Sequence, residues 1–128
     1  MFSFTKDQKV FDIGSIHFGG QPGLHPTVLF GGLFFKGHLD FEIASKHIHE
    51  MIELSEKIGV PAIPDVFIKK EKDIQSILDL IEKTLADSHP FSVDITDAGV
   101  KVKVLEELHN RTLLSRVIYN SIPVGITD

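Results

Sequence analysis

Short apolar runs alternate with longer segments whose apolar residues recur every three or four positions, and this alternation constrains the fold more than any other feature. The runs are predicted to be strands, at residues 27–35, 61–67, 91–95 and 116–122. The segments between them are predicted to be amphipathic helices, at residues 41–58, 73–85 and 97–108. Strands and helices that alternate with short connections predict an α/β protein with a parallel sheet.

Local signals refine these elements. Gly59 stands where a helix C-cap belongs, and Asp73 and Asp97 are predicted to N-cap the two later helices. Residues 27–35 are almost continuously apolar, which is typical of a strand buried on both faces of a parallel sheet. The pair Gly31–Gly32 inside this run indicates a close approach to the backbone.

A β-hairpin is predicted before the alternating part, at about residues 8–18. Polar and apolar residues alternate in Lys9–Ile13, Gly14–Ser15 can form the turn, and Ile16–Phe18 returns. The glycines and proline of Gly19–Gly23 then predict an irregular loop. We therefore expect one domain over residues 1–128, with a hairpin followed by four strands and three intervening helices.

Two architectures fit this order of elements. One is an open, doubly wound sheet, and the other is part of a closed (β/α)8 barrel. The chain has 128 residues, whereas a complete barrel needs about 250. Periodicity does not separate the two architectures.

Composition excludes several kinds of site. The net charge of −5 argues against a nucleic-acid-binding surface, which needs clustered Lys and Arg. The absence of Cys excludes thiolate nucleophiles and Cys-ligated zinc, and the seven His residues show no metal-ligand spacing, so we expect no bound metal. Neither a signal peptide nor an apolar run long enough for a membrane span is present, and we expect a cytoplasmic protein.

Three polar residues fall at or near the carboxyl ends of predicted strands, where parallel α/β proteins place their chemistry: Asp65, Asp94 and Asn120. A carboxylate can accept two parallel hydrogen bonds from a ring N–H and a neighbouring amino group, while a carboxamide both donates and accepts. The three residues therefore suit a flat, amide-like ring. A structural role stays open for each, because such residues also cap helices and hold loops.

Several segments resemble the H subunit of tetrahydromethanopterin S-methyltransferase. They are Val10–Gly14, Gly19–Gly23 with the following Pro26–Leu29, and Val117–Ile122 with the following Ile126–Asp128. These motifs occur in the order and spacing of that family, and the resemblance runs over essentially the whole chain. The wider class includes methyltetrahydrofolate:corrinoid methyltransferases and dihydropteroate synthases.

This resemblance implies a fold and a site. The fold would be the N-terminal portion, about half, of a (β/α)8 TIM barrel preceded by a β-hairpin. In the wider class an Asp ending the third barrel strand and an Asn ending the fourth hold the pterin ring, and Asp94 and Asn120 stand at those places. Asp65 receives less support and is a weaker candidate for the same pocket.

The resemblance also implies an activity in one-carbon metabolism of the kind used in methanogenesis. A methyl group would move from N5 of methyl-tetrahydromethanopterin, or methyl-tetrahydrofolate, to the Co(I) corrinoid (cobamide) of a partner protein. We expect that corrinoid protein or other methyltransferase-complex subunits as partners, a homo-oligomer, and peripheral membrane association only through a complex. Catalytic residues are expected on strands that this chain lacks.

Two other hypotheses remain. In the second, the chain is a non-catalytic α/β module for pterin binding or assembly, or an inactive fragment. In the third, it is a complete flavodoxin-like domain, although the segment Lys36–Asp40 lacks the run of Ser, Thr and Gly residues of a phosphate-binding loop.

Overall fold

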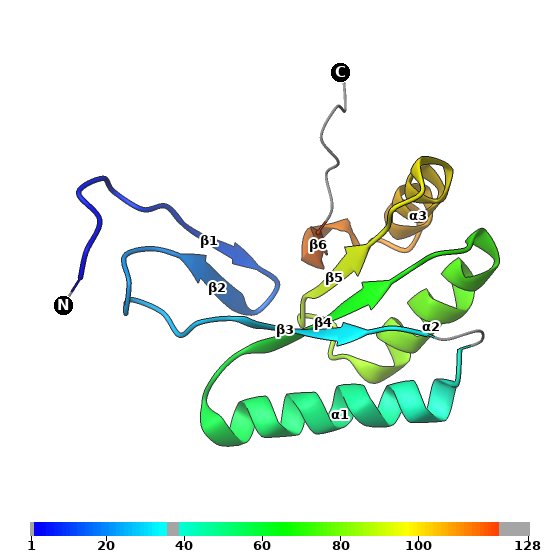
Figure 1. Ribbon diagram of the computed structural model, residues 1–128, viewed down its shortest axis with the longest axis horizontal. Coiled ribbons are helices and arrows are strands. Elements are labelled where there is room, and N and C mark those ends of the chain that lie inside the picture. Colours follow the sequence, from blue (N-terminus) through cyan, green and yellow to red (C-terminus); the bar gives the residue numbers. More distant parts are fainter. Residues whose placement is uncertain (1, 36–38, 121–128) are drawn as a thin grey trace.

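Four parallel strands form one sheet in the computed structural model, which describes residues 2–35 and 39–120 (Figure 1). In sheet order the strands are β3 (Leu29–Leu33), β4 (Ala62–Phe67), β5 (Phe91–Asp94) and β6 (Val117–Tyr119). The helices between successive strands are α1 (Phe41–Ile58), α2 (Ile74–Thr84) and α3 (Ala98–Asn110). Short 3-10 turns at Glu71–Asp73 and Leu114–Arg116 precede α2 and β6. The predicted α/β alternation with a parallel sheet is confirmed, and Ser121 and Ile122 of the last predicted strand lie outside the described residues.

All three helices pack against one face of the sheet. The residues Leu33, Val66, Val93 and Tyr119 are successive register partners across the four strands. They pack with apolar side chains of α1, α2 and α3 in a single core cluster, which includes Ile48, Leu78 and Val104. Because side chains alternate between the faces of a strand, the neighbouring register row must lie on the opposite, helix-free face.

Two of the three predicted helix caps are confirmed. The Asp97 carboxylate accepts a 2.9 Å hydrogen bond from the Val100 N–H, and Gly59 has a left-handed φ of 70° and donates its N–H to the Ser55 carbonyl. The prediction for Asp73 is wrong, because its side chain makes no capping bond to α2. Asp73 belongs to the preceding 3-10 turn and has right-handed helical backbone angles, whereas a capping residue needs an extended backbone.

The strand β3 is less buried than its apolar sequence predicts. Leu29 and Phe30 are each 48% exposed, so the expectation that both faces are buried is wrong. The reason is position, because β3 is an edge strand of the described sheet and pairs there only with β4. Gly31 does allow the expected close approach, since a Cβ there would collide with the Met51 side chain of α1.

The hairpin contacts the amino end of the sheet. Strands β1 (Val10–Ile13) and β2 (Ile16–Gly19) pair antiparallel, and the Ser15 N–H donates to the Ser88 carbonyl, just before β5, at 2.8 Å. Ile16 of β2 and Ile63 near the start of β4 are both buried, and neither belongs to the helix-side cluster. The helix-free face is therefore closed towards its amino end.

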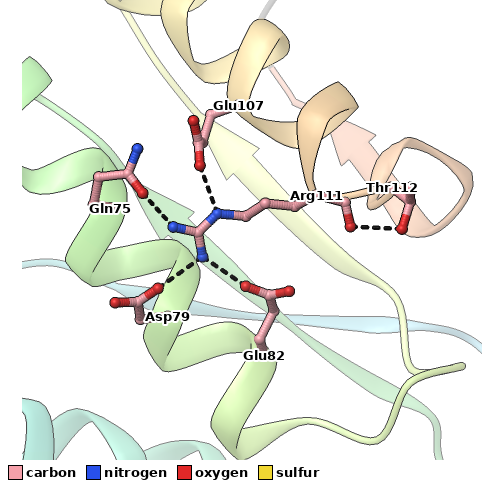
Figure 2. A network of polar contacts seen from close by, with 6 residues as sticks. All are labelled: Gln75, Asp79, Glu82, Glu107, Arg111 and Thr112. Carbon is pink, nitrogen blue, oxygen red and sulfur yellow. Dashed lines mark hydrogen bonds and ion pairs between the residues drawn. The ribbon is translucent and has the colours of Figure 1, made fainter.

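Arg111, the C-cap residue of α3, contacts side chains along the length of α2 (Figure 2). Its guanidinium donates to Glu107 at 2.7 Å, Asp79 at 2.8 Å and Glu82 at 2.6 Å, and also to the Gln75 side-chain oxygen. Burial works to lower the pKa of Arg111, but these hydrogen bonds outweigh it and raise the pKa above its ordinary value. The contact fixes the spacing of two helices that support β4, β5 and β6.

Replacing this guanidinium should loosen the helix pair. We expect Arg111→Met to lower the free energy of unfolding by about 1–3 kcal/mol, because three carboxylates then face one another without a cation. The loss for Arg111→Lys should be smaller, since an ammonium keeps the charge but cannot hold four partners in one plane. Urea unfolding followed by circular dichroism measures both variants. Equal stability of Arg111→Met and wild type would show that the network contributes nothing.

Candidate functional site at the carboxyl edge of the sheet

The polar residues singled out in the sequence lie on the helix-free face. Gly32, Asp65, Ser92 and Ile118 are successive register partners and form the row next to the one that packs under the helices. Asp94 and Asn120 stand two residues after Ser92 and Ile118, so they share this face nearer the carboxyl edge. The structure therefore brings Asp65, Asp94 and Asn120 to one edge of the sheet.

Asp65 and Asn120 are in direct contact although 55 residues separate them in the sequence. The Asn120 Nδ2 donates a 2.9 Å hydrogen bond to Oδ2 of Asp65. The Asn120 backbone N–H also donates to the Val93 carbonyl at 3.1 Å. Asn120 is thus held to β5 by its backbone and to β4 by its side chain, while the residue as a whole stays exposed.

Asp94 is the last residue of β5, the strand between β4, which carries Asp65, and β6, which precedes Asn120. Its backbone carbonyl accepts a hydrogen bond of 3.0 Å from the Ile68 N–H, and the residue is partly buried. The following helix is capped by Asp97, so capping does not require Asp94. Asp94 thus ends β5 at the edge where ligands of parallel α/β proteins bind.

Two buried polar atoms in this region have no hydrogen-bond partner among the described residues. One is Oδ1 of Asp65, and the other is Oγ of its register neighbour Ser92, a residue that is fully buried. Such atoms are costly in a folded protein, and most buried polar groups have a hydrogen-bond partner. Ser92 was not among the predicted site residues. Its signal was a lone hydroxyl in the otherwise apolar start of the run Phe91–Ile95.

The Tyr119 hydroxyl is also buried without a partner among the described residues, and burial raises the pKa of Tyr119. Its place is the helix-facing side, where Lys101 of α3 lies over its ring at 5.9 Å. Tyr119 thus belongs to the packing of α3 and not to the polar edge.

The described residues contain no group of three His, Asp or Glu side chains placed to hold a metal ion. His89 is partly buried and its Nε2 donates to the Ala62 carbonyl at 2.9 Å. Burial lowers the pKa of His89, which favours the neutral ring. None of the helices in the described ranges is long and apolar enough to cross a membrane.

The carboxyl edge combines a carboxylate at Asp94 with an exposed carboxamide at Asn120 and the Asp65 carboxylate behind it. It offers hydrogen-bond acceptors and donors to a flat polar ring. The fold and this edge define an α/β protein of the class that places its ligands at the carboxyl ends of parallel strands.

Comparison with known proteins assigns the family. The model of the tetrahydromethanopterin S-methyltransferase MtrH subunit family matches residues 6–128, and the chain belongs to this family. The resemblance expected from the motifs is thereby confirmed.

Curated relatives are similar over nearly the whole chain. The tetrahydromethanopterin S-methyltransferase H subunit from Methanopyrus kandleri is 36% identical over 96% of the chain and 41% of its own length. Its counterpart from Methanothermobacter marburgensis is 33% identical over 100% of the chain and 44% of its length. That of Methanosarcina barkeri is 30% identical over 98% of the chain and 43% of its length. The chain therefore spans less than half the length of these relatives.

The unpartnered hydroxyl of Ser92 leads to a prediction about the free energy of unfolding. Ser92→Ala should leave the free energy of unfolding unchanged or raise it by up to about 1 kcal/mol, because no hydrogen bond is lost and a buried polar atom is removed. Ser92→Leu should lower it by about 1–3 kcal/mol, because its bulk does not fit between Asp65 and Ile118. Thermal and urea unfolding test both. A clear loss of stability in Ser92→Ala would reveal a partner for the hydroxyl.

Proposed function

We propose that this chain is the pterin-binding part of a methyltransferase that moves a methyl group from a reduced pterin to a corrinoid. The donor would be methyl-tetrahydromethanopterin, with methyl-tetrahydrofolate as the alternative, and the acceptor would be Co(I) in the corrinoid of a partner protein. The observation that carries the proposal is the gathering of Asp65, Asp94 and Asn120 at one strand edge in a chain of this family.

Asp94 and Asn120 would hold the pterin ring. The carboxylate of Asp94 accepts two parallel hydrogen bonds, from the ring N–H and the exocyclic amino group. Asn120 keeps its amide oxygen and its second amide hydrogen for the neighbouring edge of the ring, because one hydrogen is donated to Asp65. These contacts fix the ring and leave the methyl group to face the partner.

The reaction needs orientation more than a nucleophile from the protein. As the bond between the methyl carbon and N5 breaks, its electron pair stays on N5, which takes up a proton. The corrinoid of the partner would supply Co(I) as the nucleophile that accepts the methyl group, and the products would be the demethylated pterin and a methylated corrinoid. Holding the two reactants in line supplies much of the acceleration. The names of the relatives describe a subunit, which supports other subunits of a methyltransferase complex as partners.

We also propose that the chain forms the first half of a (β/α)8 barrel, as one domain in which further strands complete the ring. Three features support a barrel over a doubly wound sheet. The strands follow in chain order, the helices cover one face only, and Asp65 of β4 meets Asn120 beyond β6 across the small Ser92 of β5. Contacts between alternate strands are typical of a barrel interior.

Apolar surface at both edges of the sheet is consistent with further barrel units. A groove of about 380 Å³ runs between β3 and α1, lined by Leu29, Phe30, Met51, Leu54 and Ile58. At the other edge, Val102 and Leu105 of α3 are 56% and 41% exposed. Ile58 of α1 is 55% exposed as well, and no neighbour among the described residues covers these side chains.

If further strands close the barrel, a charge placed in this groove should lower the stability of the closed barrel more than that of this chain alone. Leu54 is 57% exposed, so Leu54→Glu should change the stability of this chain alone by less than about 0.5 kcal/mol. In a complete protein, in which further strands close the barrel, the same change should cost about 2 kcal/mol or more, because it would bury an unpaired carboxylate. Chemical unfolding of both forms measures the difference.

The matched control is Lys46→Glu on the same helix, where the side chain is 73% exposed. It should be mild in both forms. Equal, small effects of Leu54→Glu in the two forms would contradict the barrel.

Pterin binding tests the function directly. Calorimetry of the complete protein with methyl-tetrahydromethanopterin and methyl-tetrahydrofolate should show binding that Asp94→Asn and Asn120→Ala each weaken by about tenfold to a hundredfold, since each variant loses hydrogen bonds of about 1.5–3 kcal/mol. Asn110→Ala, at the far end of α3, should bind like wild type.

The companion assay follows loss of Co(I) absorbance when the corrinoid protein is added. Binding without methyl transfer would identify a non-catalytic pterin module. Absence of binding in a well-folded complete protein would refute the proposed function.

A further inference from the structure

Asp65 differs from the other two polar residues in where its oxygens lie. Oδ2 accepts the hydrogen bond from Asn120 at 2.9 Å, and Oδ1 is buried away from solvent. Oδ2 is thus already engaged by Asn120, and Oδ1 has no exposed surface. Asn120, in contrast, is exposed and stands at that edge.

The contact decides which way the Asn120 amide faces. An ionised carboxylate only accepts hydrogen bonds, so the amide must turn its Nδ2 towards Asp65. Its Oδ1 then points elsewhere, and with the backbone N–H bonded to Val93 the residue is held from two strands. An unrestrained exposed carboxamide would populate both amide orientations and several rotamers.

We propose that Asp65 is a positioning residue, which locks the Asn120 carboxamide with its oxygen turned to the pterin and does not itself touch the ring. The inference rests on the proposed function, because it assigns the Asn120 oxygen as an acceptor for a donor group of that ring. Fixing the side chain before binding removes the cost of ordering it, which favours the bound state.

The register explains how a residue of β4 reaches past β5. Asp65 and Ile118 are both register partners of Ser92, whose side chain is the smallest polar one that the row contains. A larger side chain at Ser92 would fill the space through which Asp65 meets Asn120. The small side chain of Ser92 in β5 therefore contributes to the contact between Asp65 and Asn120.

A double-mutant cycle in the complete protein tests the lock, with methyl-tetrahydromethanopterin as the probe and calorimetry as the measurement. Asp65→Ala should weaken binding about threefold to tenfold by the loss of preorganisation. The double variant with Asn120→Ala should bind as weakly as Asn120→Ala alone, because Asp65 acts only through that amide. If the two substitutions weaken binding independently, so that their fold-changes multiply in the double variant, Asp65 contacts the ligand itself and the proposal is overturned. Unchanged binding by Asp65→Ala would also overturn it.

A polarity swap separates positioning from general stability. Asn120→Asp alone sets two carboxylates against each other and should weaken binding at least about tenfold. Adding Asp65→Asn restores a donor–acceptor pair in the opposite sense and keeps an oxygen facing the ring, so it should recover most of the affinity. Failure to recover it in a well-folded double variant would contradict the lock.

The side-chain amide of Asn120 gives a readout without ligand. Its NMR signals, identified by their loss in Asn120→Ala, should exchange slowly in wild type and fast in Asp65→Ala. Fast exchange in wild type would refute the lock even if the pterin binds. Slow exchange together with no pterin binding would instead refute the proposed function while the lock stands.

Discussion

The alternation of side chains along parallel strands divides this sheet into two faces, and the rest of the structure depends on that division. One register row, from Leu33 to Tyr119, packs under all three helices. The adjacent row, from Gly32 to Ile118, faces away from them and carries Asp65 and Ser92. A shift of one residue in the pairing of β4 would bury Asp65 under the helices and expose Val66, so the core and the polar edge are specified by the same register.

Local sequence signals predicted those parts of the fold that depend on local physics. Helical periodicity placed three helices, and the caps Asp97 and Gly59 act within one turn of the backbone. The prediction for Asp73 was wrong because a 3-10 turn, which no side-chain pattern announced, set its backbone angles. The burial predicted for Leu29 and Phe30 was wrong because burial depends on which strand lies alongside, and an apolar run does not say whether that neighbour is present.

The candidate site shows the same limit. Strand ends can be read from the sequence, so Asp65, Asp94 and Asn120 were predicted to share an edge. That Asp65 bonds to Asn120 could not be predicted, since 55 residues separate them and the contact passes over a third strand. It depends on the pairing of β4, β5 and β6 and on the small side chain of Ser92 between them, and the pairing has no local pattern. The orientation of the Asn120 amide follows only once this partner is known.

The polar face is not what stability alone would select. Each buried polar atom without a partner costs about 1–3 kcal/mol, and Asp65 Oδ1 and Ser92 Oγ lie side by side in the register. The neighbouring row shows that the same strands carry Leu, Val and Tyr where packing decides the residue. Towards the amino end the helix-free face also becomes apolar, with Ile63 fully buried. On the helix-free face, Asp65 thus lies two residues beyond Ile63 and Ser92 is its register partner, towards the strand ends where parallel α/β proteins place their ligands.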